Sequence, residues 1–129
     1  MACILIIDDD DQFRTMLRMT LERAGYETVE ARDGAEGLEC YQAHPVDVVI
    51  TDIVMPGKEG LETIQELWRD HPAVKIIAIS GGGQKIEPHM ALACAQAFGA
   101  QYAFSKPVDR AALLDAIQHL LGREPGMTE

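Results

Sequence analysis

The sequence predicts an α/β fold built on a doubly wound, five-stranded parallel sheet. Short runs rich in Ile and Val alternate along the chain with segments whose apolar residues recur every three or four positions. The predicted strands end near residues 7, 30, 51, 79 and 104. One strand–helix unit therefore takes roughly 25 residues, the scale of the βα repeat in folds whose strands run parallel.

Composition and charge restrict the class of protein. The chain has 129 residues, close to the usual size of one domain, with 47% apolar and 25% charged residues. A net charge of −10 argues against direct binding to nucleic acid or to an anionic membrane. The apolar runs are too short to cross a bilayer and the chain start does not resemble a signal peptide, so we expect a cytoplasmic protein. The three cysteines form no Cys-x-x-Cys pair, and we expect reduced thiols.

Each strand is predicted from a short apolar run. Residues 3–7, 47–51 and 74–79 lack strict alternation of polar and apolar residues, which is typical of strands covered on both faces. Residues 101–104 form a weaker run. Residues 26–30 are more polar, so we expect this strand at an edge of the sheet.

The first two helices are predicted from apolar spacing and from the residues that begin and end them. Phe13 opens an amphipathic stripe, and Gly25 ends this helix. Asp33 caps the second helix, which His44 and Pro45 terminate.

Three further helices complete the pattern. The third contains the apolar stripe of residues 61–68 and stops before residue 71. Pro88 suits the first turn of a fourth helix, which ends at Gly99. Asp109 caps the fifth helix, whose apolar stripe lies within residues 113–121.

Polar residues suited to phosphoryl chemistry lie at the ends of the predicted strands. In a doubly wound sheet, ligands bind at the carboxyl ends of the strands. Four consecutive aspartates follow the first strand, and three other strand ends provide a carboxylate, a hydroxyl and an ammonium: Asp8, Asp9, Asp10, Asp11, Asp52, Ser80 and Lys106. Carboxylates packed this closely repel one another unless a cation such as Mg²⁺ compensates. A carboxylate is also a nucleophile toward phosphorus, so the set predicts uptake of a phosphoryl group.

In this order and at these intervals, the motifs resemble the receiver domains of two-component response regulators, specifically the chemotaxis-type single-domain kind. The resemblance covers essentially the whole chain. It rests on the segments ILIIDDD (4–10), VVITDIVMP (48–56, with Gly60), IAISG (77–81) and FSKP (104–107). It implies a flavodoxin-like (βα)5 fold with strand order 2-1-3-4-5. A receiver domain would occupy residues 1–122, followed by a short polar tail, 123–129.

The resemblance also implies how the domain would work. Asp52 would accept the phosphoryl group, Ser80 would donate a hydrogen bond to it, and Lys106, followed by a cis-proline, would pair with its charge. The phosphoryl donor would be a histidine kinase or a histidine phosphotransfer protein. Phosphorylation would switch a face that docks a downstream protein, in a monomer or a weak dimer formed through the fourth and fifth helices and the fifth strand. Such a domain is no enzyme beyond its own phosphorylation and dephosphorylation.

The same resemblance implies a Mg²⁺ site. Asp9, Asp52 and the backbone carbonyl of Val54 would bind the ion directly, and Asp8 would act through a coordinated water. The next two aspartates are expected to begin the first helix, where the helix dipole favours a carboxylate.

One position departs from the family pattern. The family usually has an aromatic residue three positions before the lysine, which turns inward when the hydroxyl is recruited. This chain has Ala103 there, between Tyr102 and Phe104. We therefore expect a phosphorylation-dependent change to concentrate in the glycine-rich segment 81–83 and around residues 86–90.

Two alternatives remain at this point. A haloacid-dehalogenase-type phosphatase would also use an aspartyl-phosphate and Mg²⁺, with Asp8 as nucleophile and Asp10 as acid. That family needs a second acidic pair after its fourth strand, where this sequence has Ser80 and three glycines. The other alternative is a degenerate receiver that binds partners without phosphate, but such a domain would be expected to have lost part of the site.

Overall fold

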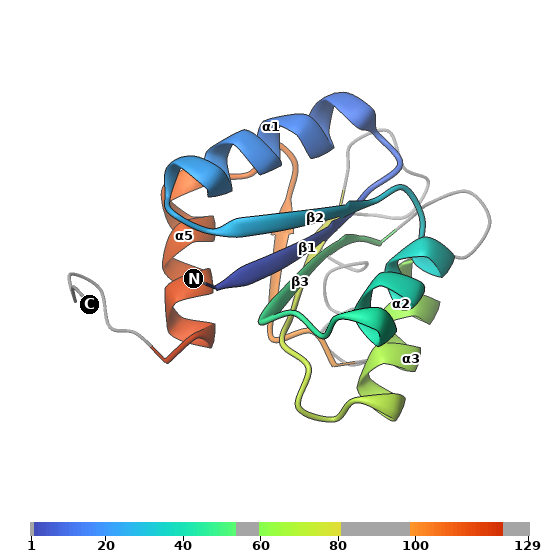
Figure 1. The fold of residues 1–129 in the computed structure, drawn as a ribbon. Helices are drawn as coiled ribbons and strands as arrows, with labels where there is room; N and C mark the ends of the chain where they lie inside the picture. The colour runs from blue at the N-terminus through green and yellow to red at the C-terminus, as the bar shows by residue number, and fades with distance from the viewer. Residues whose placement is uncertain (1, 54–59, 81–98, 123–129) are drawn as a thin grey trace.

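The computed structural model describes residues 2–53, 60–80 and 99–122 (Figure 1). The elements, in chain order, are β1 (Cys3–Ile7), α1 (Asp11–Arg23), β2 (Glu27–Ala31), α2 (Gly34–Ala43), β3 (Val48–Asp52), α3 (Gly60–Asp70), β4 (Ile76–Ser80), β5 (Tyr102–Ser105) and α5 (Arg110–Leu120). The predicted fourth helix, residues 88–98, lies outside the described residues. Among the helices of the described ranges, none has the length and apolar character needed to cross a membrane.

The five strands form one parallel sheet in the order β2-β1-β3-β4-β5, which confirms the predicted topology. The polar strand β2 lies at an edge, as its composition predicted. At the centre, Ile7 of β1 is opposite Ala31 of β2 and Thr51 of β3. This register brings the carboxyl ends of the central strands to the same edge of the sheet.

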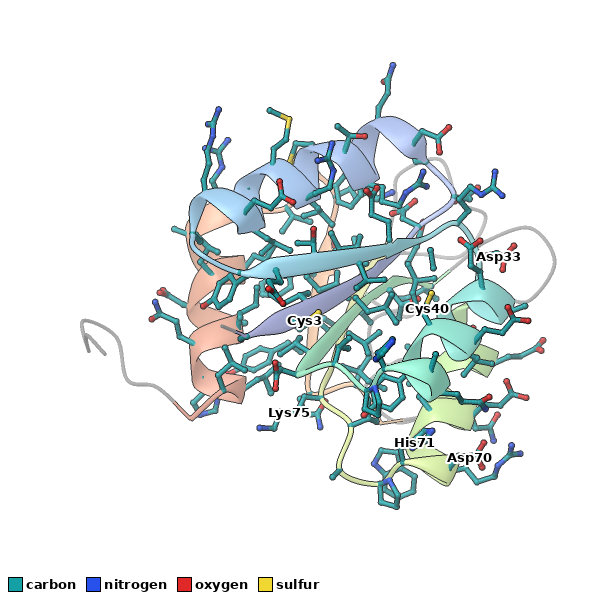
Figure 2. All side chains as sticks on the ribbon, viewed as in Figure 1. Cys3, Asp33, Cys40, Asp70, His71 and Lys75 are labelled. Carbon is teal, nitrogen blue, oxygen red and sulfur yellow. The ribbon has the colours of Figure 1, made fainter. Side chains whose placement is uncertain are left out.

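Helices cover both faces of the sheet (Figure 1). Side chains fill the space on each side (Figure 2), because successive residues of a strand point to opposite faces. Leu5 and Ile7 are buried in the core under α2 and α3, the α2/α3-side core. Ile4 and Ile6 are buried under α1 and α5, in the α1/α5-side core. The central strands are thus immobilised from both sides.

Helices α1, α2 and α5 begin close to the residues that the sequence indicated. Asp10, Asp33 and Asp109 are the N-caps of α1, α2 and α5, and each side chain accepts hydrogen bonds from backbone N–H groups of the first turn. Gly25 follows α1 with a φ of +95°. These ends fix where the loops at the site begin.

Three strands end on a polar residue, one position beyond their apolar runs. β3, β4 and β5 end at Asp52, Ser80 and Ser105. The ladder continues because its hydrogen bonds come from the backbone: Asp52 is opposite Ile79, and Ser80 is opposite Ser105. Asp52 and Ser80 are therefore held by the sheet rather than by a loop.

The cysteines of the described residues are free thiols, as expected. Cys3 lies in β1 and Cys40 in α2, both half-buried (Figure 2). Burial, and then nearby carboxylates, raise the pKa of both thiols above its ordinary value. Both therefore favour the protonated, weakly reactive form. Cys94 lies outside the described residues.

Trp68 is one of the apolar residues that predict α3, but it is not part of the buried face of that helix. Its side chain is 51% exposed, and its ring lies against Gly99, just before β5. A Cβ atom on Gly99 would lie 2.8 Å from Cδ1 of Trp68. Gly99 has a φ of +125°, so both its backbone and its surroundings favour glycine.

Gly99→Ala is expected to destabilise the fold more than Gly25→Ala. Both positions have positive φ, which costs an L residue about 1–2 kcal/mol. A methyl group at Gly25 would meet nothing within 4 Å, whereas at Gly99 it would also displace the ring of Trp68. Thermal unfolding measures the difference, and the fluorescence of Trp68, the only tryptophan in the sequence, reports the displacement. Equal losses with unchanged emission would contradict this account of Gly99.

Candidate functional site

The candidate site lies at the carboxyl edge of the sheet, where four strands end. Asp8 follows β1, Asp52 ends β3, Ser80 ends β4 and Lys106 follows β5. Asp8, Asp52 and Ser80 are only 1%, 4% and 3% exposed. Buried carboxylates are unfavourable unless they are paired with charges or hydrogen-bond donors, so their surroundings decide what the site can do.

Three carboxylates form an acidic cluster, which consists of Asp8, Asp9 and Asp52. One oxygen from each lies within 4.8 Å of the others, and Asp9 is exposed while the other two are buried. As predicted, Asp10 and Asp11 lie at the start of α1, outside this cluster. A cluster that offers only carboxylate oxygens suits a hard divalent cation such as Mg²⁺.

Lys106 faces the acidic cluster. Its Nζ lies 3.2 Å from Oδ2 of Asp8 and 3.6 Å from Oδ2 of Asp52. Its backbone N–H donates to the carbonyl of Ser80 at 2.8 Å, and the Lys106–Pro107 peptide is cis. The ammonium also lies 4.1 Å from the centre of the Phe13 ring, within cation–π distance.

The acidic cluster and Lys106 together carry a net negative charge. The three carboxylates of the acidic cluster and the ammonium of Lys106 sum to a formal charge of −2 when all are ionised. A divalent cation would neutralise that remainder. The donor atoms and the charge of the described residues therefore fit Mg²⁺.

The fold changes the acidity of Asp8. Burial raises the pKa of its carboxyl above the ordinary value of 3.8. The N–H of Asp10, which donates to Oδ1 of Asp8 at 2.8 Å, and the ammonium of Lys106 act in the opposite direction. The balance indicates that these partners only partly compensate the carboxylate for its lost hydration.

Ser80 carries a hydroxyl that is ready for a ligand. Its Oγ is buried, and among the described residues it has no hydrogen-bond partner. A buried polar group without a partner costs about 1–3 kcal/mol. An oxygen of a bound or covalently attached group at the acidic cluster would satisfy it.

Ala103 and the two aromatic residues beside it face opposite sides of the sheet. Ala103 packs against the α2/α3-side core, whereas Tyr102 and Phe104 pack against the α1/α5-side core. The rings of Tyr102 and Phe104 stack with centroids 6.4 Å apart, and the hydroxyl of Tyr102 is hydrogen-bonded to Nδ1 of His119. Neither ring lies on the face that Ala103 occupies.

Some predicted parts of the site fall outside the described residues. They are the backbone carbonyl of Val54, the glycine-rich segment 81–83 and residues 86–90.

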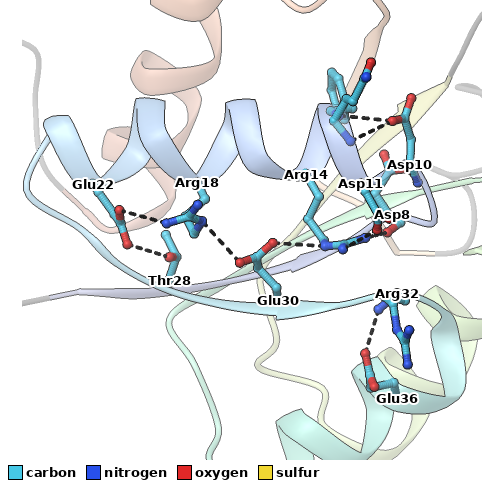
Figure 3. A network of polar contacts seen from close by, with 12 residues as sticks. Asp8, Asp10, Asp11, Arg14, Arg18, Glu22, Thr28, Glu30, Arg32 and Glu36 are labelled. Carbon is cyan, nitrogen blue, oxygen red and sulfur yellow. Dashed lines mark hydrogen bonds and ion pairs between the residues drawn. The ribbon is translucent and has the colours of Figure 1, made fainter.

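Sequence reasoning missed two contacts at the site, both made by α1. Phe13 was expected only as part of an apolar stripe, but its ring covers the ammonium of Lys106. The apolar spacing does not indicate a role for Arg14, whose Nη1 donates to the backbone carbonyl of Asp8 at 2.7 Å (Figure 3). Their position in the sequence could have indicated these contacts. Both residues lie in the first turn after the N-cap Asp10, where side chains reach back over the preceding loop.

Comparison with known proteins gives consistent matches. The family model of the response regulator receiver domain matches residues 4–118. The chain is 36% identical over 114 residues to the CAI-1 autoinducer sensor kinase/phosphatase CqsS of Vibrio cholerae, which covers 88% of this chain and 16% of that protein. It is 31% identical over 118 residues to the chemotaxis protein CheY of Halobacterium salinarum, which covers 92% of this chain and 95% of that protein.

The solved structures agree with these matches. A response regulator receiver domain protein from Clostridium thermocellum superposes with a TM-score of 0.86 at 30% identity, covering 95% of both chains. The chain spans between 28% and 49% of the transcriptional regulatory proteins that it matches, so it corresponds to one part of those longer proteins. The chain belongs to the response regulator receiver domain family, the phosphoacceptor domains of two-component signalling.

Proposed function

We propose that this chain accepts a phosphoryl group on Asp52 from a histidine kinase or a histidine phosphotransfer protein, with Mg²⁺ bound at the acidic cluster. One observation carries the proposal: three carboxylates converge within 4.8 Å beside the ammonium of Lys106. This arrangement can accept a phosphoryl group, because it combines a nucleophile with the charges that neutralise the transferring oxygens.

The positions of the two buried carboxylates support Asp52 rather than Asp8 as the nucleophile. Oδ1 of Asp8 accepts the N–H of Asp10, and Oδ2 lies 3.2 Å from Nζ of Lys106. One oxygen of Asp8 thus accepts from the backbone of its own loop, and β4 ends at Ser80 and is followed by three glycines, not by the second acidic pair that a haloacid-dehalogenase-type phosphatase needs. Asp52 lies on the central strand β3, between the strands that carry Asp8 and Ser80.

The remaining residues have distinct roles in the transfer. The carboxylate of Asp52 forms a bond to phosphorus while the bond between phosphorus and the donor's histidine nitrogen breaks. The hydroxyl of Ser80 donates to one phosphoryl oxygen, which gives this buried group a partner. Lys106 pairs with the phosphoryl charge. The presence of the complete set also disfavours the degenerate, phosphate-independent alternative.

Mg²⁺ would be held by Asp9, Asp52 and the backbone carbonyl of Val54, with Asp8 acting through a coordinated water. When bound, the ion neutralises charge on the transferring phosphoryl oxygens. Asp9 suits direct ligation because it is the exposed member of the cluster and can meet an ion that enters from solvent.

The wider proposal follows from the same site. Residues 1–122 form the receiver domain and residues 123–129 a polar tail. The domain acts in the cytoplasm as a monomer or as a weak dimer through α5, β5 and the predicted fourth helix. Phosphorylation switches a face that docks a downstream protein. It catalyses only its own phosphorylation and dephosphorylation. The net charge of −10 supports protein partners over nucleic acid.

Asp52→Asn is expected to abolish phosphorylation by a small donor such as acetyl phosphate, because an amide is not a nucleophile. The matched control is Asp47→Asn, just before the other end of β3, where the amide oxygen can still accept the N–H of Cys3. Hydroxylamine-sensitive labelling with radioactive phosphate measures both variants. Labelling of Asp52→Asn at the wild-type rate would falsify the assignment of the acceptor.

Asp9→Asn is expected to weaken Mg²⁺ binding strongly while the fold is retained. Changes behind metal ligands already weaken binding by about 10- to 100-fold, so loss of a ligand should do at least as much. Asp115→Asn removes the same charge from the exposed side of α5 (Arg110–Leu120), outside the acidic cluster, and should leave the affinity near that of the wild type. Calorimetric titration with MgCl₂ compares the variants, and equal affinities would remove Asp9 from the site.

Asp8→Asn is expected to stabilise the metal-free protein at neutral pH. Because burial raises the folded-state pKa of Asp8 above 3.8, the folded state binds this proton more tightly than the unfolded chain, and stability is lost as the pH rises through that raised pKa. Asparagine carries no charge, so the free energy of unfolding of Asp8→Asn should exceed that of the wild type at pH 7. This difference should shrink as the pH falls toward 3.8. Urea unfolding in EDTA measures it.

The control for that experiment is Asp70→Asn. Arg69 lowers the pKa of this exposed carboxyl, so the same substitution there should bring no gain at neutral pH. An Asp8→Asn variant less stable than the wild type at pH 7 would show that the partners of the carboxylate outweigh its burial.

A further inference from the structure

Arg14 connects α1 to β2 and to the loop that carries Asp8 and Asp9 of the acidic cluster (Figure 3). Its Nη1 donates to the carbonyl of Asp8 at 2.7 Å, its Nη2 pairs with Asp11, and its Nε donates to Glu30 at 3.0 Å. The side chain is only 11% exposed. A guanidinium with three partners in this geometry is held in one position and does not behave as a mobile surface charge.

The contact with Asp8 matters because of what else holds that residue. The N–H of Asp8 donates to the carbonyl of Ala31 at 3.1 Å, and its carboxylate accepts the N–H of Asp10. The bond from Arg14 therefore holds the remaining backbone group, the carbonyl of Asp8. That carbonyl shares its peptide plane with the nitrogen of Asp9, so the bond also sets the direction in which Asp9 leaves the strand.

We propose that Arg14 is a positioning residue for the metal site, because it fixes the Asp8–Asp9 peptide and so aims both carboxylates at Asp52. The inference rests on the proposed function of the acidic cluster as a Mg²⁺ site. Arg14 does not contact the ion; it acts through the backbone, as groups behind metal ligands do.

Charge and positioning predict opposite effects of removing Arg14. Arg14 is a cation near the cluster and neutralises Asp11 and Glu30, so its loss makes the surroundings more negative and would by charge alone tighten Mg²⁺ binding. Loss of the bond to Asp8 would instead release the peptide and weaken binding. The sign of the change therefore separates the two effects.

Arg18 provides a matched control one turn further along α1. It forms ion pairs with the same Glu30, at 3.2 Å, and with Glu22, at 3.6 Å. Within the described residues, its ion pairs lie along α1 and β2, away from the loop (Figure 3). Arg18→Gln thus removes the same charge from the same network and keeps the bond between Arg14 and Asp8.

The experiment compares Arg14→Gln and Arg18→Gln in the full chain by calorimetric titration with MgCl₂ and by amide hydrogen exchange without metal. We expect Mg²⁺ affinity to fall about tenfold or more in Arg14→Gln and to stay the same or rise slightly in Arg18→Gln. The amide of Asp10 should exchange faster only in Arg14→Gln. Circular dichroism establishes that both variants remain folded.

Arg14→Lys keeps the charge and serves where the glutamine variant does not fold. An ammonium cannot reproduce the fork that reaches Asp8, Asp11 and Glu30 together, so we expect this variant also to bind Mg²⁺ more weakly than the wild type. Wild-type affinity in Arg14→Lys would mean that charge suffices, and it would overturn the inference.

The other outcomes are equally distinct. Affinity in Arg14→Gln that equals or exceeds that in Arg18→Gln overturns the positioning role. Failure of the proposed function would appear differently: the wild type would bind no Mg²⁺, while faster exchange at Asp10 in Arg14→Gln alone would still support the positioning of the loop by Arg14.

Discussion

Two buried carboxylates at the ends of neighbouring strands impose the constraint on which the rest of the site depends. Asp8 and Asp52 follow the opposed residues Ile7 and Thr51, so the parallel register brings them together away from water. Their charges repel, and neither is fully hydrated. Lys106 and the N–H of Asp10 partly compensate this negative charge. In our proposal, Mg²⁺ compensates the rest. A fold with rigid strands covered on both faces can hold such an unfavourable group in place.

Strand β5 limits how a change at Ser80 can spread through the domain. Ala103 faces one core, while Tyr102 and Phe104 stack against the other. Because side chains alternate along a strand, bringing either ring to the face of Ala103 would need a one-residue slip of β5, which would turn over every side chain in it. Rotation of Tyr102 or Phe104 about its side-chain bonds therefore does not bring a ring to the face that Ala103 occupies.

The sequence by itself determined the features that depend on local pattern. Uninterrupted apolar runs identified the central strands, and the polar run of residues 26–30 identified an edge strand. Asp33 and Asp109 were recognised as caps because the preference for a carboxylate at a helix start is local. The sequence also predicted which residues lie together at the candidate site. Parallel strands end at one edge of the sheet, which brings Asp52 and Ser80 close to Lys106, the residue after β5.

Only the tertiary structure decided which atoms meet. Apolar spacing assigned Trp68 to a helix, but it cannot tell that α3 turns this ring toward Gly99 and solvent. The bond from Arg14 to Asp8 and the position of Phe13 over Lys106 depend on the direction of α1 across the end of the sheet. A hydrophobic pattern indicates only which face of a helix or strand is buried. Hydrogen bonds and ion pairs depend instead on how elements far apart in the sequence are placed relative to one another.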